Sequence, residues 1–280
     1  MNVNGYEIID GILDLSKREL TSIDSKAFLS SKQIRQVMLP RSIERIGDWA
    51  FAKCSNLRAV KFAGPFRPGL FGRDVFAGCE NLKLIEFADS DSVTARLHAL
   101  CANKLPYDHL LRSDDVGQKS WYEKWDIVFQ SVLASDDSEV RMSAALCGEE
   151  DISYDGIGSV DGELPGETGD YVQKEEFRKC SLCYIRLSNS TFLTESTENA
   201  IKNHLIANRF GEASGAAFYS IFEEDENILP YLRIYLDTVK PDRQMLSEMI
   251  SAVPAKDVYA RSFLIKEAGG TGGGADSLML

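Results

Sequence analysis

The sequence predicts an α+β protein in which a short β-solenoid is followed by an all-α domain of helical hairpins, arranged as a solenoid or a bundle. One observation behind this fold class is a repeat of 23 to 25 residues within residues 20–88. The other is a change in the spacing of apolar residues, from about two to about 3.6, after residue 92. We therefore expect a repeat domain over residues 1–90, a helical domain over 91–268 and a flexible Gly-rich tail over 269–280.

The repeat consists of three segments that align without gaps, Ala27–Leu39, Ala50–Phe62 and Val75–Phe87. Their shared columns are Phe28/Phe51/Phe76, Ser31/Cys54/Cys79, Ile34/Leu57/Leu82, Val37/Val60/Ile85 and Leu39/Phe62/Phe87. A weaker echo precedes each segment, at residues 20–24, 42–47 and 70–72. A unit of this length cannot bury its own apolar side, but stacked units form a continuous core from such columns. The last residues of each segment alternate as a short strand does, so we expect one strand per unit.

Both ends of such a short array need a cover. The segment Tyr6–Leu15 has apolar residues around a central Asp10-Gly11, a pair typical of a tight hairpin turn, and we expect it to cap the first unit. After Phe87 we expect the array to dock on the following region, so that the two form one cooperative body.

The middle unit, Ile43–Phe62, reads Ile-x-x-Ile-Gly-x-x-Ala-Phe-x-x-Cys-x-x-Leu-x-x-Val-x-Phe and resembles the BspA-like leucine-rich repeat family. The resemblance covers residues 20–88. It implies a leucine-rich-repeat β-solenoid with a curved sheet on one side. It also implies a protein that binds other proteins, since many members are bacterial surface or adhesion proteins. The helices that follow are similar to the ankyrin-like region that accompanies this repeat type.

The remainder of the chain shows helical periodicity. The apolar spacing predicts helices over residues 93–101, 121–132, 140–147, 177–187, 200–206, 213–222, 228–239, 242–252 and 255–267. Pro241 and Pro254 are expected in the first turns of the last two. Residues 149–176 hold ten acidic residues, one lysine and five glycines, so we expect a mobile acidic loop there.

Residue types that could carry chemistry are few, and each fits a structural role better. Cys180 and Cys183 form a Cys-x-x-Cys pair, but they fall within an apolar helical stripe and no second pair exists to complete a zinc site. The histidines, His98, His109 and His204, lie in no recognised catalytic motif. We therefore expect no enzyme, no metal and no cofactor.

Charge and composition exclude several classes of partner. The net charge is −12, which disfavours nucleic acid or an anionic membrane as the partner of the whole molecule. No apolar stretch approaches the roughly 18 to 20 residues that a membrane-spanning helix needs. The N-terminus lacks the basic segment of a secretory signal and the six cysteines read as reduced thiols, so the expected location is the cytoplasm.

Two columns of the repeat are candidates for binding a partner. The first is basic in every unit, with Arg35, Arg58 and Lys83. The second follows on the outward side of each expected strand, with Met38, Lys61 and Glu86. The basic column is open to two interpretations: a solvated face paired with the acidic helical half, or a stripe that docks an acidic protein partner.

The sequence thus favours a non-enzymatic protein–protein interaction scaffold that uses leucine-rich and helical repeat surfaces. Two alternatives stay open. One is a hydrolase or transferase with a site between the two halves. The other is a surface adhesion protein exported by an unrecognised route.

Overall fold

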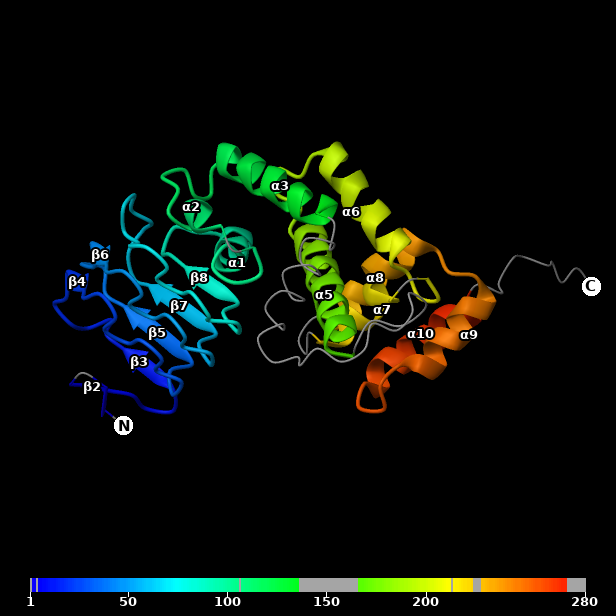
Figure 1. Ribbon diagram of the computed structural model, residues 1–280, viewed down its shortest axis with the longest axis horizontal. Coiled ribbons are helices and arrows are strands. Elements are labelled where there is room, and N and C mark those ends of the chain that lie inside the picture. The colour runs from blue at the N-terminus through cyan, green and yellow to red at the C-terminus, as the bar shows by residue number, and fades with distance from the viewer. Residues whose placement is uncertain are drawn as a thin grey trace, which may run out of the picture. The chain divides into compact units, whose positions relative to one another are not determined.

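A computed structural model gives the fold (Figure 1). The structure describes residues 2–3, 5–105, 107–135, 166–212, 214–223 and 228–270. The predicted helix over 140–147 lies outside these residues, as does most of the tail.

The chain divides into two compact units. The first comprises Met1–Phe129 together with Thr191–Leu193, and the second comprises Gln130–Ser190 together with Thr194–Leu280. The change from strands to helices falls close to residue 90, as expected from the spacing. The first compact unit continues well beyond that point, because the helices that follow pack on the last repeat.

The first unit is built on a four-stranded parallel sheet, in the order β3 (Ile12–Asp14), β5 (Gln36–Leu39), β7 (Ala59–Phe62) and β8 (Leu84–Glu86). Figure 1 shows these four strands side by side. The register joins each strand to the next one repeat further along, so the aligned columns of the sequence become rows across the sheet. The inner row is fully buried and consists of Leu13, Val37, Val60 and Ile85. The predicted β-solenoid is confirmed.

The weaker echo in the sequence forms a second, shorter ladder. Strand β4 (Ser22–Ile23) pairs in parallel with β6 (Arg45–Ile46), and Ile46 forms a further parallel bridge with Phe71. At Gly47 the backbone passes so close to the preceding unit that a Cβ would lie 2.5 Å from the amide nitrogen of Ser25. This approach explains the Ile-Gly pair of the repeat.

Aromatic rings stack through the core of the array. Phe28 and Phe51 are parallel with centroids 5.1 Å apart, and Phe51 and Phe76 follow at 5.8 Å, as the repeat predicts. The buried thiols of Cys54 and Cys79 each donate to the carbonyl of the phenylalanine one unit earlier, both at 3.1 Å. These cysteines therefore connect successive units and pack as small side chains in the core.

The N-terminal cap is a hairpin for only part of its length. Asp10 and Gly11 adopt positive φ angles of 50° and 80°, and Ile9 and Ile12 exchange backbone hydrogen bonds of 3.1 and 2.8 Å. The preceding strand, β2 (Tyr6–Glu7), then pairs with β1 (Asn2–Val3) instead of continuing along β3.

The other end of the sheet is covered by three helices, α1 (Ser92–Leu100), α2 (Asp108–Leu111) and α3 (Lys119–Ala134). Helix α1 packs against β8, and its N-cap Asp91 accepts from the amide of Thr94. The buried indoles of Trp121 and Trp125 donate to the carbonyls of Leu110 and Leu97, which ties α3 to the helices before it.

The second unit is helical. Its helices are α5 (Gly166–Ser188), α6 (Glu195–Ala207), α7 (Ala216–Tyr219), a 3₁₀ turn (Ser220–Glu223), α8 (Ile228–Val239), α9 (Arg243–Ala252) and α10 (Val258–Gly270). The side chains of Thr194 and Asp242 cap α6 and α9 by accepting an amide hydrogen bond from the residue three positions further on.

Three sequence expectations for this unit are wrong in detail. The sequence predicts an acidic loop that extends to residue 176, but α5 already begins at Gly166. Residues 149–165 of that expected loop lie outside the described residues. The single helix expected over 213–222 is a short α-helix followed by a 3₁₀ turn. Pro241 and Pro254 both precede the first turns of α9 and α10.

Candidate protein-binding surface

The side of the sheet that faces away from the core carries two rows of side chains, which we call the sheet face. The first row is Ile12, Gln36, Ala59 and Leu84, and the second is Asp14, Met38, Lys61 and Glu86. Because strand side chains alternate, these residues point away from the buried inner row. All of them are half-buried or exposed.

A third row, the basic column, lies immediately before the strands. Arg58 donates its amide to the carbonyl of Arg35 at 2.8 Å, and Lys83 donates to Arg58 at 2.9 Å. The structure therefore brings the three predicted basic residues onto successive rungs of one ladder. All three are exposed. Adjacent strands lie about 4.7–4.9 Å apart, so the like charges are close.

The arginines of the basic column lack carboxylate partners in the part of the chain that the structure describes. No ion pair joins Arg35 or Arg58 to a described acidic side chain, although described pairs occur elsewhere in the same unit. The aliphatic part of the Arg35 side chain lies across Gly11, where a Cβ would come within 2.9 Å of its Cδ. Neither guanidinium group thus forms an ion pair with a described carboxylate, although Asp10 lines a surface hollow together with Arg35.

The second predicted column behaves differently. Lys61 Nζ lies 3.0 Å from Glu86 Oε2, and both side chains are 44% exposed. Such a surface pair contributes about 0–1 kcal/mol to stability. Met38 lies between Asp14 and Lys61 in the same row. This row, with a net charge of −1, therefore offers a mixture of polar and apolar contacts next to the basic column.

Two shallow hollows border the sheet face. One holds about 340 Å³ and is lined by all three residues of the second predicted column, together with Phe62 and Phe87. The other holds about 410 Å³ near the start of the strands and is lined by Arg35, Lys32 and Asn56, among others. Both of the predicted columns thus contribute residues to surface depressions.

The row formed by Ile12, Gln36, Ala59 and Leu84 was missed in the sequence. Ile12 is 38% exposed, and Ile9 beside it in the hairpin is 61% exposed. The alternation of each strand, extended by one residue toward its N-terminus, would have identified this row. Its apolar members provide area that a partner can cover.

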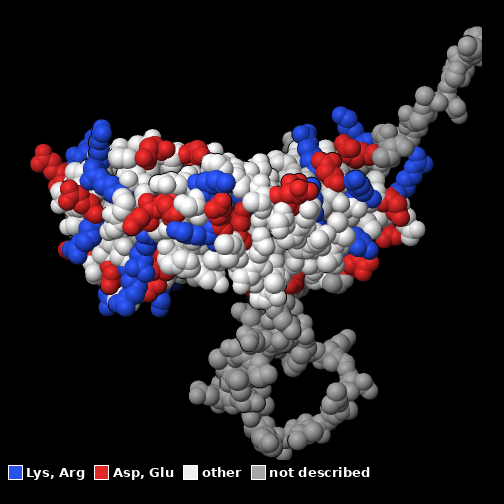
Figure 2. All heavy atoms as spheres, turned by 90° about the horizontal axis from the view of Figure 1, so that it is seen from above, with Lys and Arg blue, Asp and Glu red and all other residues white. Residues whose placement is uncertain are grey.

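Charge on the rest of the surface is mixed. On the face seen in Figure 2, basic and acidic side chains are interspersed and do not form a continuous patch of one sign. The basic column is therefore a local feature of a chain whose net charge is −12.

The thiols of the Cys-x-x-Cys pair and the imidazole of His98 are all buried. Burial raises the pKa of the Cys180 and Cys183 thiols above the usual value, so both remain protonated near neutral pH. Burial lowers the pKa of His98 to about 4. Within the described ranges, no group of three or more His, Cys, Asp or Glu side chains is placed to hold a metal ion. Among the same residues, no helix has the length and apolar character needed to span a membrane.

Comparison with known proteins agrees with the repeat. Residues 13–103 match the model of the BspA type leucine rich repeat region in six copies. No curated protein and no solved structure matches the chain. The match ends before the helices of the second unit, so it does not confirm an ankyrin-like character for them.

Proposed function

We propose that this chain, whose N-terminal third is a BspA-type leucine-rich repeat region, is a non-enzymatic scaffold that binds an acidic protein partner on its sheet face. Leucine-rich repeats generally mediate protein–protein interaction or adhesion, and the repeat family is typically non-enzymatic. The partner class and the surface are the specific parts of the proposal.

The observation that carries the proposal is the basic column. Arg35, Arg58 and Lys83 occupy successive rungs, and the two arginines have no carboxylate partner among the described residues. Stacked like charges repel one another and attract an opposite charge. An acidic segment lying across the strands would meet one basic side chain on each rung. The neighbouring rows would then supply apolar contact through Ile12, Met38 and Leu84.

The same proposal places the protein in a reducing compartment, the cytoplasm. The five described cysteines are all free and buried. Cys54 and Cys79, whose thiols bond to backbone carbonyls, serve in the core as thiols. Proteins that work in oxidising compartments more often use cysteines in disulfides.

The test is a triple variant, Arg35→Ser, Arg58→Ser and Lys83→Ser. The full-length protein would first be used to capture partners from the source cell, with identification by mass spectrometry. The affinity of the purified partner would then be measured for both proteins. We expect at least a tenfold loss, which corresponds to about 1.4 kcal/mol, and a weaker dependence on salt.

A matched control changes the same number of exposed basic residues outside the basic column, Lys17→Ser, Arg41→Ser and Lys53→Ser. This control should bind the partner as the unmodified protein does. Equal affinity of the basic-column variant and the unmodified protein would show that the sheet face does not bind the partner through charge.

A further inference from the structure

The N-terminal hairpin opens into a slot between β2 and β3. The only hydrogen-bonded pair of this hairpin among the described residues is Ile9 with Ile12, which exchange two backbone hydrogen bonds. In a fully paired hairpin the next hydrogen-bonded pair would be Glu7 with Asp14. No such bond forms among the described residues, and β2 pairs with β1 on its other edge through Val3–Tyr6 and Asn2–Glu7.

The walls of the slot present backbone groups that can form hydrogen bonds. Gly11 and Leu15 bond to β5, so alternation along the strand turns the amide and carbonyl of Asp14 away from β5, toward the slot. Tyr6 pairs with Val3, two intervening residues apart in the sequence, and at this separation the facing residues form a hydrogen-bonded pair, so alternation directs the backbone of Glu7 to the other side of β2. Within the described residues, neither Glu7 nor Asp14 has a backbone partner at the slot.

The two edges of the four-stranded sheet differ. At the β8 edge, α1 packs against the strand and the Asn103 side chain donates to the carbonyl of Leu82 at 2.6 Å. At the β3 edge, the described cover is the single pair formed by Ile9 and Ile12. An open strand edge is a template for an additional strand.

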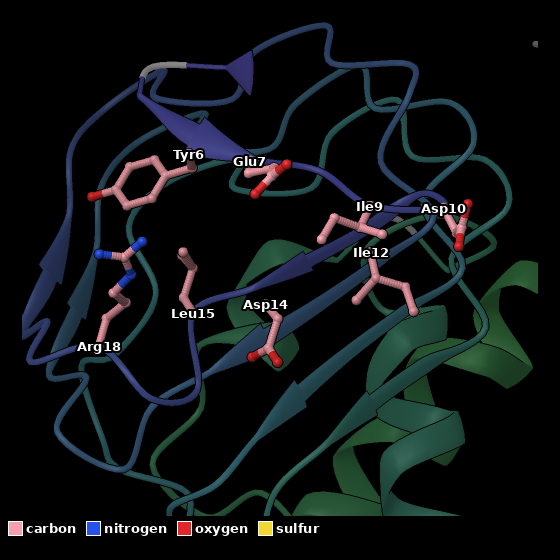
Figure 3. Close-up of a pocket in the computed structure, with 8 residues that line it drawn as sticks. All are labelled: Tyr6, Glu7, Ile9, Asp10, Ile12, Asp14, Leu15 and Arg18. Carbon is pink, nitrogen blue, oxygen red and sulfur yellow. The ribbon is translucent and has the colours of Figure 1, made fainter. Parts of the chain in front are cut away.

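A surface hollow of about 340 Å³ lies at this slot (Figure 3). In Figure 3, Tyr6 and Arg18 lie at one end of the hollow, Ile9 and Ile12 lie at the other, and Leu15 lies between them. Ile9 is 61% exposed and Ile12 is 38% exposed. Asp10 also lines the hollow at the Ile9 and Ile12 end, so the hollow combines two apolar side chains beside a carboxylate with open backbone groups.

Carboxylates give the slot its charge. Glu7 and Asp14 both line it, and Arg18 is confined to the Tyr6 end. Ser16 donates its amide and its hydroxyl to Asp14 Oδ1, at 2.9 and 2.6 Å, and these bonds lower the pKa of Asp14. Closing the hairpin would place Glu7 directly opposite Asp14, and like charges in that position are unfavourable. The slot therefore stays open and favours a positive group.

We propose that this slot binds an extended segment of a partner protein in which an apolar residue lies two positions from a lysine or arginine. The segment would lie as an additional strand, with backbone hydrogen bonds to Glu7 and Asp14. Its basic side chain would meet the two carboxylates, and an apolar side chain would cover Ile9 and Ile12. A second copy of this chain fits poorly, because two-fold pairing would bring the same carboxylates against one another.

The test uses the full chain and a labelled peptide, acetyl-Val-Thr-Lys-Thr-Val-amide, in which lysine and both valines share one face of an extended strand. Binding would be measured by fluorescence anisotropy and located by amide chemical shifts. We expect saturable binding with shifts centred on residues 6–15. A peptide with glutamate in place of lysine, and one with both valine amides methylated, should each bind at least tenfold more weakly, because they lose the charge or the backbone donors.

The matching protein variant is Glu7→Gln with Asp14→Asn, which preserves shape and removes both charges. It should also bind the lysine peptide at least tenfold more weakly. The control variant is Asp74→Asn with Glu80→Gln, which removes two acidic side chains from the third repeat and should leave binding unchanged. Equal binding of the three peptides, shifts centred on the basic column, absence of binding at millimolar peptide, or concentration-dependent self-association that the Glu7/Asp14 variant abolishes would each overturn the proposal. None of these results depends on whether the sheet face binds an acidic partner.

Discussion

His98 is a titratable residue that the first unit uses as part of its core. It is fully buried among Phe66, Phe71, Phe87 and Trp121, with ring centroids 5.8 to 6.0 Å away. Its Nε2 lies 2.8 Å from the carbonyl of Leu111, and its Nδ1 has no hydrogen-bond partner among the described residues. Since an imidazolium would be costly to bury here, His98 is neutral in the folded protein.

The burial of His98 predicts a dependence of stability on pH. Loss of solvation lowers its pKa from 6.5 to about 4, so the unfolded chain binds the proton more strongly. The stabilisation is complete above about pH 6.5 and is lost as the pH falls toward 4, by about 3 kcal/mol. Urea unfolding followed by tryptophan fluorescence at pH 7 and at pH 4.5 would measure it.

The control for this prediction is His98→Gln, which keeps a donor for the Leu111 carbonyl but does not titrate. This variant will be less stable at pH 7, yet its free energy of unfolding should change less between the two pH values. Carboxylates elsewhere in the chain contribute equally to both proteins. Identical pH dependence in the two proteins would show that His98 is not the titrating group.

At the scale of elements, α1 covers the C-terminal end of the repeat array, and the hairpin lies at its N-terminal end. Residues Leu97 and Leu100 of α1 are buried, and its Thr94 hydroxyl lies 2.9 Å from the Tyr122 hydroxyl of α3. Helices α1 and α2 and the part of α3 up to Phe129 therefore belong to the repeat unit as its C-terminal cap. An array without them would expose Phe87 and the open edge of β8.

This cap predicts different behaviour for two fragments. A fragment of residues 1–135 contains the sheet and its helical cover, and it should unfold cooperatively in one transition. A fragment of residues 1–90 loses the burial of at least two leucines, which costs about 3 kcal/mol or more. We expect it to melt at least about 10 °C lower, or to aggregate. Circular dichroism during heating would compare the two, and equal melting temperatures would contradict the role of α1 to α3.

The strands and core positions of the array could be predicted from the sequence because equivalent residues of successive units occupy equivalent environments. Phe28, Phe51 and Phe76 occupy equivalent positions, so their alignment alone indicated that they stack. The start of α5 was missed because the acidic composition around Gly166 resembles a loop, while the favourable placement of acids at a helix N-terminus is a local effect. The opening of the hairpin was missed because the Asp10-Gly11 turn predicts pairing along the whole of Tyr6–Leu15, and composition does not reveal that pairing stops after Ile9 and Ile12.

The binding surface could be predicted from the sequence only in part. Arg35, Arg58 and Lys83 were found because they share a column of the repeat, and so were Met38, Lys61 and Glu86. The row that includes Ile12 depends on the strand register. The slot depends on the lack of a hydrogen-bonding partner for the backbone amide and carbonyl of Asp14 on the side away from β5. Those features follow from hydrogen bonds between segments, which no single segment specifies.

For the whole molecule, we expect the protein partner to bind one side of the repeat unit, although the chain as a whole is acidic. Residues 1–90 carry 13 Lys and Arg against 11 Asp and Glu, whereas the rest carries 18 against 32. The positive charges proposed to bind the partner, those of the basic column, are therefore a local feature that the repeat places on successive rungs. The second unit contributes most of the negative charge.

Lysine footprinting would measure directly whether the sheet face and the basic column are covered when the partner binds. The full-length protein would be acetylated briefly with and without its captured partner, and the extent of modification at each lysine would be measured by mass spectrometry. We expect Lys61, on the sheet face, and Lys83, in the basic column, to become at least several-fold less reactive in the complex. Lys26 and Lys53, in the turns between the strand ladders, should react equally in both samples. Protection of Lys26 and Lys53 with unchanged reactivity at Lys61 and Lys83 would contradict the assignment of the sheet face as the binding surface.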